Sequence, residues 1–147
     1  MTPQRGHLLD ASALLAVLFQ EPGSEVVARI IDDCAIHAVN LAETVRKMLQ
    51  TGVPAAETQG ILDELDLEVN PALTVPDAFA AGCLAFQTRD RGLSLGDYVC
   101  LSVAAQTGQT VVTADHMWSE ITGLRVKVIQ IRQRRSTHDV QLTTSTD

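Results

Sequence analysis

Five short apolar runs, separated by stretches with helical spacing, constrain the fold of this chain most strongly. We expect the runs to be strands, and they occupy residues 7–10, 34–39, 67–70, 110–114 and 126–131. Strands that alternate with helices usually pair in parallel through right-handed crossovers. The sequence therefore predicts a three-layer α/β domain with a parallel sheet between layers of helices.

Helical patterns fill the intervals between these runs. The apolar residues of 40–52 fall on one helical face, with Asn40 as the expected N-cap and Gly52 just beyond the end. At 147 residues the chain is most simply one domain, which we expect to span residues 1–134. The polar, Ser- and Thr-rich residues 135–147 are expected to be a poorly ordered tail. The expected helices are 12–20, 24–33, 40–52, 54–66, 76–88 and 94–108.

Charge and aromatic content limit how this chain could bind nucleic acid. Aromatic residues make up only 3% of the chain, which argues against a platform that stacks single-stranded bases. Lys and Arg supply most phosphate affinity, yet 11 of them stand against 18 acids, for a net charge of -7. Composition alone therefore does not support binding to nucleic acid.

The cysteines and the apolar runs bear on the cellular compartment. Cys34, Cys83 and Cys100 lack metal-ligand spacing and lie in apolar surroundings, which predicts buried, reduced thiols in a cytoplasmic protein. Asp10 interrupts the one stretch that could pass for a signal peptide. No run approaches the roughly 20 apolar residues that a membrane helix needs, so we expect no membrane association.

Carboxylates recur where strands end and helices begin. Asp10 and Asp115 each follow a predicted strand, while Glu43 and Asp97 lie near predicted helix starts. Ligand sites in parallel sheets lie beyond the carboxyl ends of the strands. If the strands before Asp10 and Asp115 are neighbours, these two carboxylates converge there.

Each acid has an ordinary structural explanation when it is taken alone. Asp10 and Asp115 could cap helices, and Asp97 stands three residues after Ser94, the spacing of a capping box. Glu43 has the same spacing from Asn40, and it could also pair with a lysine four residues later.

A cluster of these acids would need a compensating charge. Two carboxylates about 4 Å apart repel each other by about 4 kcal/mol at an effective dielectric constant of about 20. Oxygen ligands without His or Cys favour Mg²⁺ or Mn²⁺. The pattern therefore indicates a site for a divalent metal.

Four segments in this order resemble the PIN-domain ribonucleases, particularly the toxins of VapBC-type toxin–antitoxin pairs. They are "LLDASALLAVLFQEPG", "NLAETVRKM", "LSLGDYVCLSVAAQTG" and "VVTADHMW", and the resemblance covers about residues 7–131. It implies a five-stranded parallel sheet and a Mg²⁺- or Mn²⁺-dependent endoribonuclease that leaves 5′-phosphate and 3′-hydroxyl ends. The acidic quartet of the family falls on Asp10, Glu43, Asp97 and Asp115.

The resemblance also implies supporting residues and partners. Ser12 and Thr113 match small polar residues that support the metal ligands without binding the metal directly. The family implies a homodimer whose activity is blocked by a cognate antitoxin that inserts a segment across the active-site groove. His116 stands where relatives often carry Arg, and we expect it to be exposed without a functional role.

An RNA substrate follows from the resemblance and not from the charge of the chain. The cations best placed in the sequence to contact an RNA backbone are Arg46, Lys47, Arg89 and Arg91.

Other functions compete with this interpretation. A haloacid-dehalogenase-like phosphatase needs a second Asp at the position of Ser12, and a response-regulator receiver needs a Lys after the fifth strand, whereas Lys127 lies within it. The stronger alternative is a catalytically weak PIN fold that acts as a binding or regulatory protein, which the acidic charge favours.

Overall fold

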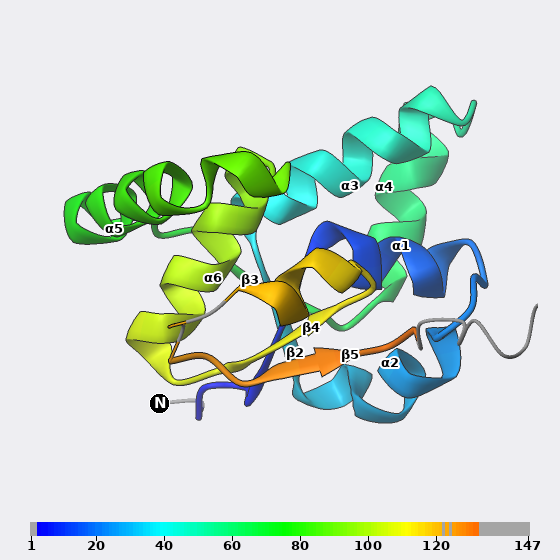
Figure 1. The fold of residues 1–147 in the computed structure, drawn as a ribbon. Helices are drawn as coiled ribbons and strands as arrows, with labels where there is room; N and C mark the ends of the chain where they lie inside the picture. Colours follow the sequence, from blue (N-terminus) through cyan, green and yellow to red (C-terminus); the bar gives the residue numbers. More distant parts are fainter. Residues whose placement is uncertain (1–2, 122, 124, 133–147) are drawn as a thin grey trace, which may run out of the picture.

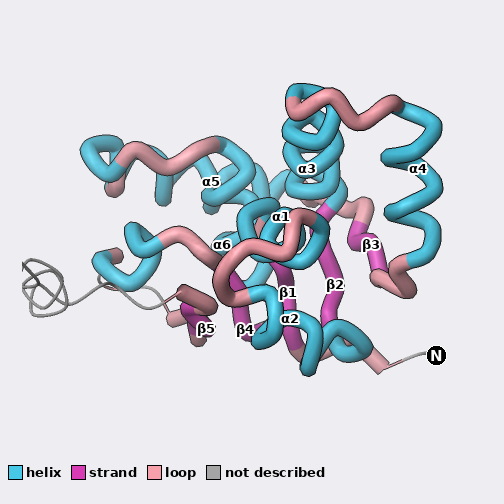
Figure 2. Tube along the Cα trace, turned by 90° about the vertical axis from the view of Figure 1, so that its right-hand side faces the viewer, coloured by secondary structure: helices cyan, strands magenta, loops and turns pink. Residues whose placement is uncertain are grey.

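The protein folds around a parallel sheet, as a computed structural model that describes residues 3–121, 123 and 125–132 shows. Its five strands lie in the order β3-β2-β1-β4-β5 (Figure 2). Every neighbouring pair of strands is parallel. The strands are β1 (His7–Leu9), β2 (Cys34–His37), β3 (Glu68–Asn70), β4 (Thr110–Thr113) and β5 (Val128–Gln130). The predicted fold class is confirmed.

Alternate residues of the strands build two hydrophobic cores, one on each face of the sheet. Leu8 and Val111 face one core, while their neighbours Leu9 and Val112 face the other. This alternation is the two-residue period of a strand, and it makes the sheet the middle of three layers. All four side chains are fully buried.

The helices divide between these two cores (Figure 1). Helices α1 (Ala11–Leu18) and α2 (Ser24–Ile30) cover the face that carries Leu9. Helix α6 (Leu95–Thr107) covers the other face, and α5 (Val75–Gln87) packs against α6. The remaining elements are α3 (Ala38–Gln50), α4 (Ala55–Glu64) and the 3₁₀ helices η1 (Ile31–Asp33), η2 (Arg89–Arg91) and η3 (His116–Glu120).

The start of α3 differs from the prediction. Strand β2 ends at His37, whose ring Nδ1 accepts a hydrogen bond from the Val39 N–H at 3.1 Å and caps the helix. Asn40 therefore lies inside the first turn, and the predicted capping box of Asn40 with Glu43 is wrong. The sequence predicted one strand over 34–39 because the apolar run continues into α3, where Val39 also packs against the core.

The prediction that all three cysteines are buried is wrong for Cys83. Cys34 and Cys100 are buried free thiols, whereas Cys83 is exposed on α5. Apolar residues surround Cys83 in the sequence because both the inward and the outward side of α5 are apolar.

Two further predictions concern membrane-spanning helices and the C-terminal boundary of the domain. No helix within the described ranges is both long enough and apolar enough to cross a membrane. The domain boundary at residue 134 and the predicted tail, residues 135–147, lie outside the described residues.

Candidate active site

The carboxyl ends of β1 and β4 meet at one edge of the sheet. These strands are parallel neighbours, with Leu9 opposite Val112, and the Asp10 N–H donates to the Val112 carbonyl at 3.1 Å. Asp10 directly follows β1, and Asp115 follows β4 after one residue. The predicted convergence of these two acids is therefore confirmed.

All four predicted acids line one pocket of about 180 Å³. They reach it from the end of β1, from α3, from the first turn of α6 and from the segment after β4. Ser12, Arg46 and Lys47 also line this pocket. Its lining residues are Asp10, Ala11, Ser12, Leu15, Glu43, Arg46, Lys47, Asp97 and Asp115.

The other predicted residues lie elsewhere. Arg89 and Arg91 belong to η2 and are not among the residues that line the acidic pocket. His116 is half-buried, so its predicted exposure is wrong, and it lines a second pocket with residues of β5 and of the segment around Gly23.

Asp10 is held in place by hydroxyl groups and a backbone amide. Only 2% of the residue is exposed. Its carboxylate accepts from Thr113 Oγ1 at 2.5 Å and from the Ala13 N–H at 2.8 Å, and Ser12 Oγ lies 2.7 and 2.9 Å from its two oxygens. Burial, with a smaller contribution from the charge of Asp97, raises the pKa of Asp10 to about 7 despite these hydrogen bonds.

Ser12 and Thr113 also tie the two strand ends together. Ser12 Oγ accepts from the Ala114 N–H at 2.9 Å, and Thr113 Oγ1 accepts from the Asp115 N–H at 3.0 Å. The two hydroxyl oxygens lie 3.3 Å apart. These contacts fit the supporting role that we expected for both residues.

Asp97 and Asp115 are positioned by helix caps. Asp97 Oδ2 accepts from the Ser94 N–H at 2.8 Å, and Ser94 Oγ accepts from the Asp97 N–H at 3.2 Å, so the predicted capping box is confirmed. Asp115 Oδ1 accepts from the Met117 N–H at 2.9 Å and caps η3. Burial raises the pKa of Asp97, and the charge of Asp115 raises it further.

Glu43 reaches the pocket between Asn40 and the start of α6. Asn40 Nδ2 donates to Glu43 Oε1 at 3.3 Å and to the Gly96 carbonyl at 3.1 Å, and Ser94 Oγ donates to Glu43 Oε2 at 3.3 Å. A Cβ atom on Gly96 would lie 1.6 Å from Glu43 Oε1. Burial raises the pKa of Glu43, as does the charge of Asp97.

Asn40, Ser94 and Gly96 are therefore supporting residues whose contacts with Glu43 the sequence did not reveal. The sequence marked Asn40 and Ser94 only as helix caps. Gly96 carried one usable signal, because a glycine in the first turn of an otherwise regular helix indicates a close approach by another group.

The donor set fits a hard divalent cation in its chemistry. Asp10, Glu43 and Asp97 all have raised pKa values, so their negative charges are unfavourable where they lie. A cation in the pocket would relieve this cost. Among the described residues, no three His, Cys, Asp or Glu side chains are grouped tightly enough to hold an ion by themselves. Water would complete the coordination, as is usual for Mg²⁺.

Comparison with known proteins agrees with this geometry. The sequence pattern described as the PIN domain matches residues 7–124. No curated protein sequence matches this chain.

Several solved structures are similar in fold. They include VapBC2 from Rickettsia felis bound to a DNA fragment from its promoter (TM-score 0.65, 19% identity, 84% of this chain and 98% of that chain). DNA-bound VapBC from Salmonella typhimurium is similar with a TM-score of 0.67 and 17% identity, over 86% of this chain and 98% of that chain. VapBC-5 from Mycobacterium tuberculosis is similar with a TM-score of 0.59 and 23% identity, over 85% of this chain and 98% of that chain. At these identities the similarity establishes the fold.

Proposed function

Because this chain belongs to the PIN-domain family, whose members are generally nucleases, we propose that it is a divalent-metal-dependent endoribonuclease. One observation carries the proposal, namely that Asp10, Glu43, Asp97 and Asp115 line a single pocket. Structural caps alone would not require four ionisable acids at the same place, because Ser, Thr or Asn would cap as well.

Each of these residues has a proposed role. Asp10, Asp97 and Asp115 would hold Mg²⁺ or Mn²⁺, and Glu43 would be a further ligand or the base that orients water. When bound, such an ion supplies Lewis acidity toward a phosphate and makes water more acidic.

The remaining side chains around the pocket support this chemistry. Ser12 and Thr113 hold the carboxylate of Asp10 by hydrogen bonds. Arg46 and Lys47 give the acidic pocket a positive rim, which suits the phosphate backbone of RNA.

The biological role that we propose is that of a cytoplasmic toxin with a cognate antitoxin. The similar solved structures named above are VapBC complexes, and this chain covers 98% of each matched chain. Expression of this protein alone should then arrest growth. Co-expression of a small protein encoded by a neighbouring reading frame should relieve the arrest.

Cleavage of defined tRNA and rRNA fragments by the purified protein tests the activity. We expect cleavage with Mn²⁺ and none with a chelator. Asp97→Asn should lower the rate by at least about 100-fold with an unchanged circular dichroism spectrum, because it removes a charged ligand. Glu57→Gln, which removes an exposed acid on α4, is the matched control and should cut at the wild-type rate. A wild-type rate for Asp97→Asn would remove Asp97 from the mechanism.

The alternative function is that of a catalytically weak PIN fold that binds or regulates. The net charge of -7 favours it. RNA binding without any Mn²⁺-dependent degradation would support this function over the nuclease.

A further inference from the structure

A second pocket, of about 510 Å³, lies beside the acidic pocket. His116 lines it, and the preceding residue, Asp115, lines the acidic pocket. Gln130 of β5 also lines the second pocket, and its Nε2 donates to the Asp115 carbonyl at 2.7 Å. Strand β5 is the parallel neighbour of β4 (Figure 1), so both pockets lie beyond the carboxyl ends of the strands. Because adjacent residues line the two pockets, one strand of bound RNA can reach both.

One wall of the second pocket is the loop before α2, which is fixed to the end of β5. Arg132 Nε donates to the Pro22 carbonyl at 2.9 Å, and Arg132 Nη2 donates to Glu21 Oε2 at 3.2 Å. Gly23 has a φ of +95°, and a Cβ atom there would lie 2.6 Å from the Ile131 carbonyl oxygen. The loop backbone therefore packs directly against the residues that follow β5, and these contacts fix the shape of the pocket.

Two residues of the second pocket carry hydrogen-bond acceptors. The Asp115 carbonyl can only accept, so the NH₂ group of Gln130 faces it and Oε1 of the same amide points the other way. This Oε1 is buried and has no hydrogen-bond partner among the described residues. A ligand that donates a hydrogen bond to it would remove the cost of the unpaired group. Glu25, in the first turn of α2, adds an exposed carboxylate, so the pocket suits a ligand with several N–H donors.

The charges of the second pocket favour an uncharged base over a phosphate. Arg132 is paired with Glu21, and Glu25 adds a further negative charge that repels a phosphate. A nucleobase meets no such repulsion, and the volume of the pocket is within the range of about 300–1,000 Å³ that is typical of small-molecule sites. A scissile phosphate in the acidic pocket would leave the neighbouring base beside the second pocket.

We propose that the second pocket binds the base of the nucleotide next to the scissile phosphate and prefers guanine, an inference that rests on the proposed nuclease function. On its Watson–Crick edge guanine carries two adjacent donors, N1–H and N2–H₂, which match the two oxygens of the Glu25 carboxylate. Adenine, cytosine and uracil each carry one donor group there, next to an acceptor that the carboxylate repels. The second hydrogen of the guanine amino group is available to Gln130 Oε1, and the ring of His116 offers a flat surface for stacking.

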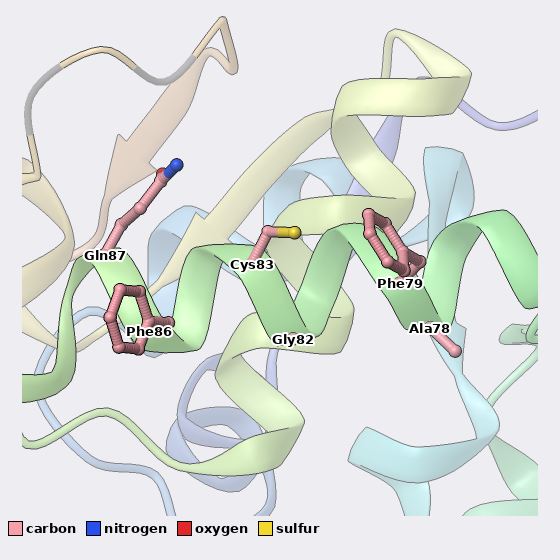
Figure 3. A pocket seen from close by; sticks show the side chains of 6 residues that line it. All are labelled: Ala78, Phe79, Gly82, Cys83, Phe86 and Gln87. Atoms are coloured by element: carbon pink, nitrogen blue, oxygen red, sulfur yellow. The ribbon is translucent and has the colours of Figure 1, made fainter.

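A groove of similar volume, about 530 Å³, lies on α5 and lacks these features. Figure 3 shows it lined by Phe79, Cys83 and Phe86, with Gln87 at one end. None of its lining residues carries a charge, and none lines the acidic pocket. It therefore offers a base no carboxylate and no position next to the scissile phosphate, and Gln87 is a matched control for Gln130.

Binding of labelled RNA heptamers tests the preference for guanine. The heptamers have the sequence UUUXUUU and differ only in the central base X. Fluorescence anisotropy in Mn²⁺ gives their Kd for the full chain with Asp97→Asn, a substitution that keeps the RNA intact during the measurement. The heptamer with central guanine should bind at least about 10-fold more tightly than the others, as for a bidentate contact to a base.

Further substitutions in the same protein assign this preference to the second pocket. Glu25→Gln should abolish it, because an amide offers one acceptor oxygen in place of two. Gln130→Leu should reduce it by about 5-fold, the loss expected for one hydrogen bond. Glu57→Gln and Gln87→Leu are the matched controls and should leave it unchanged. Circular dichroism checks that each variant is folded.

Cleavage of an RNA pool of random sequence, followed by sequencing of the ends, tests the position of the base. With the wild type and Mn²⁺, guanine should be enriched at one of the two positions that flank the cut. Glu25→Gln should lower the ratio of cuts beside guanine to cuts beside other bases by at least about 10-fold. This ratio separates base recognition from a loss of catalysis, which would lower all cuts alike.

The two experiments distinguish the base pocket from the nuclease activity. Cleavage without a preference for guanine, or a preference that survives Glu25→Gln, would overturn the base pocket and leave the nuclease standing. Binding that prefers guanine and depends on Glu25, without cleavage of any RNA, would support the base pocket and overturn the nuclease.

Discussion

At the scale of single residues, the buried carboxyl group of Asp10 couples the fold to pH. In the folded protein its pKa is raised to about 7 from 3.8, chiefly by burial. Between these values the folded state holds a proton that the unfolded state has lost, so the free energy of unfolding falls as the pH rises. This contribution is complete below pH 3.8 and is lost above about pH 7.

Urea unfolding with a chelator present measures this effect. From about pH 5 to about pH 8 the wild type should lose about 2–3 kcal/mol more stability than Asp10→Asn, which has no proton to lose. Both proteins also share any loss due to Glu43 and Asp97, so the variant serves as the internal control. An equal loss in the two proteins would show that Asp10 ionises normally.

Gly96 has no Cβ atom, and the space that this leaves is occupied by the carboxylate of Glu43. In Gly96→Ala the new Cβ would lie 1.6 Å from Glu43 Oε1, so the Glu43 side chain must move out of the pocket. We expect cleavage to fall by about 10–100-fold, as for the loss of a supporting contact to a metal ligand.

Gly60→Ala is the matched control for this change, because Gly60 also lies in a helix and a Cβ there meets nothing within 4 Å. It should cleave RNA normally and be more stable by up to about 1 kcal/mol, since Ala favours helix over Gly. Equal cleavage by Gly96→Ala and Gly60→Ala would mean that the position of Glu43 does not matter for activity.

At the scale of elements, α5 and α6 both begin with a capping box, but the two boxes differ in the side chains that they contact. Each starts with a capping box, Thr74 with Asp77 in α5 and Ser94 with Asp97 in α6. Only the box of α6 reaches the acidic pocket, where Ser94 Oγ also donates to Glu43.

This difference predicts different consequences for two similar substitutions. Thr74→Ala and Ser94→Ala should each cost about 1 kcal/mol of stability, as for the loss of an N-cap. Only Ser94→Ala should also slow RNA cleavage, because it removes the hydrogen bond from Ser94 Oγ to Glu43, while the backbone N–H at position 94 still donates to Asp97. Chemical unfolding and the cleavage assay, applied to both variants, measure the two effects. If Thr74→Ala slowed cleavage as much, the effect would come from stability and not from the pocket.

Local chemistry decided which elements could be predicted from the sequence. The Ser94–Asp97 box was predictable because both partners lie within one turn. The cap by His37 was not, because His is an uncommon N-cap residue and the apolar run hides the end of β2. The exposure of Val75, Phe79 and Phe86 on α5 was also not predictable. A helix that is apolar on both sides does not reveal which side the core covers.

At the scale of the whole molecule, the topology was predictable and the detail of the pocket was not. Alternating strands and helices predicted the parallel sheet, and this predicted that Asp10 and Asp115 converge. The contacts of Glu43 with Ser94 and of Asn40 with Gly96 depend on how α3 crosses the start of α6. No local pattern encodes that crossing, because it brings together groups more than 50 positions apart.

The pairing of β1 with β4 has a consequence for a chain still emerging from the ribosome. His7 lies opposite Thr110, so the first strand stays without this neighbour until more than 100 further residues have been made. Asp10 cannot meet Asp115 before then. A nascent fragment that ends before β4 therefore lacks the assembled acidic pocket, and synthesis itself delays the assembly of this site until most of the polypeptide exists.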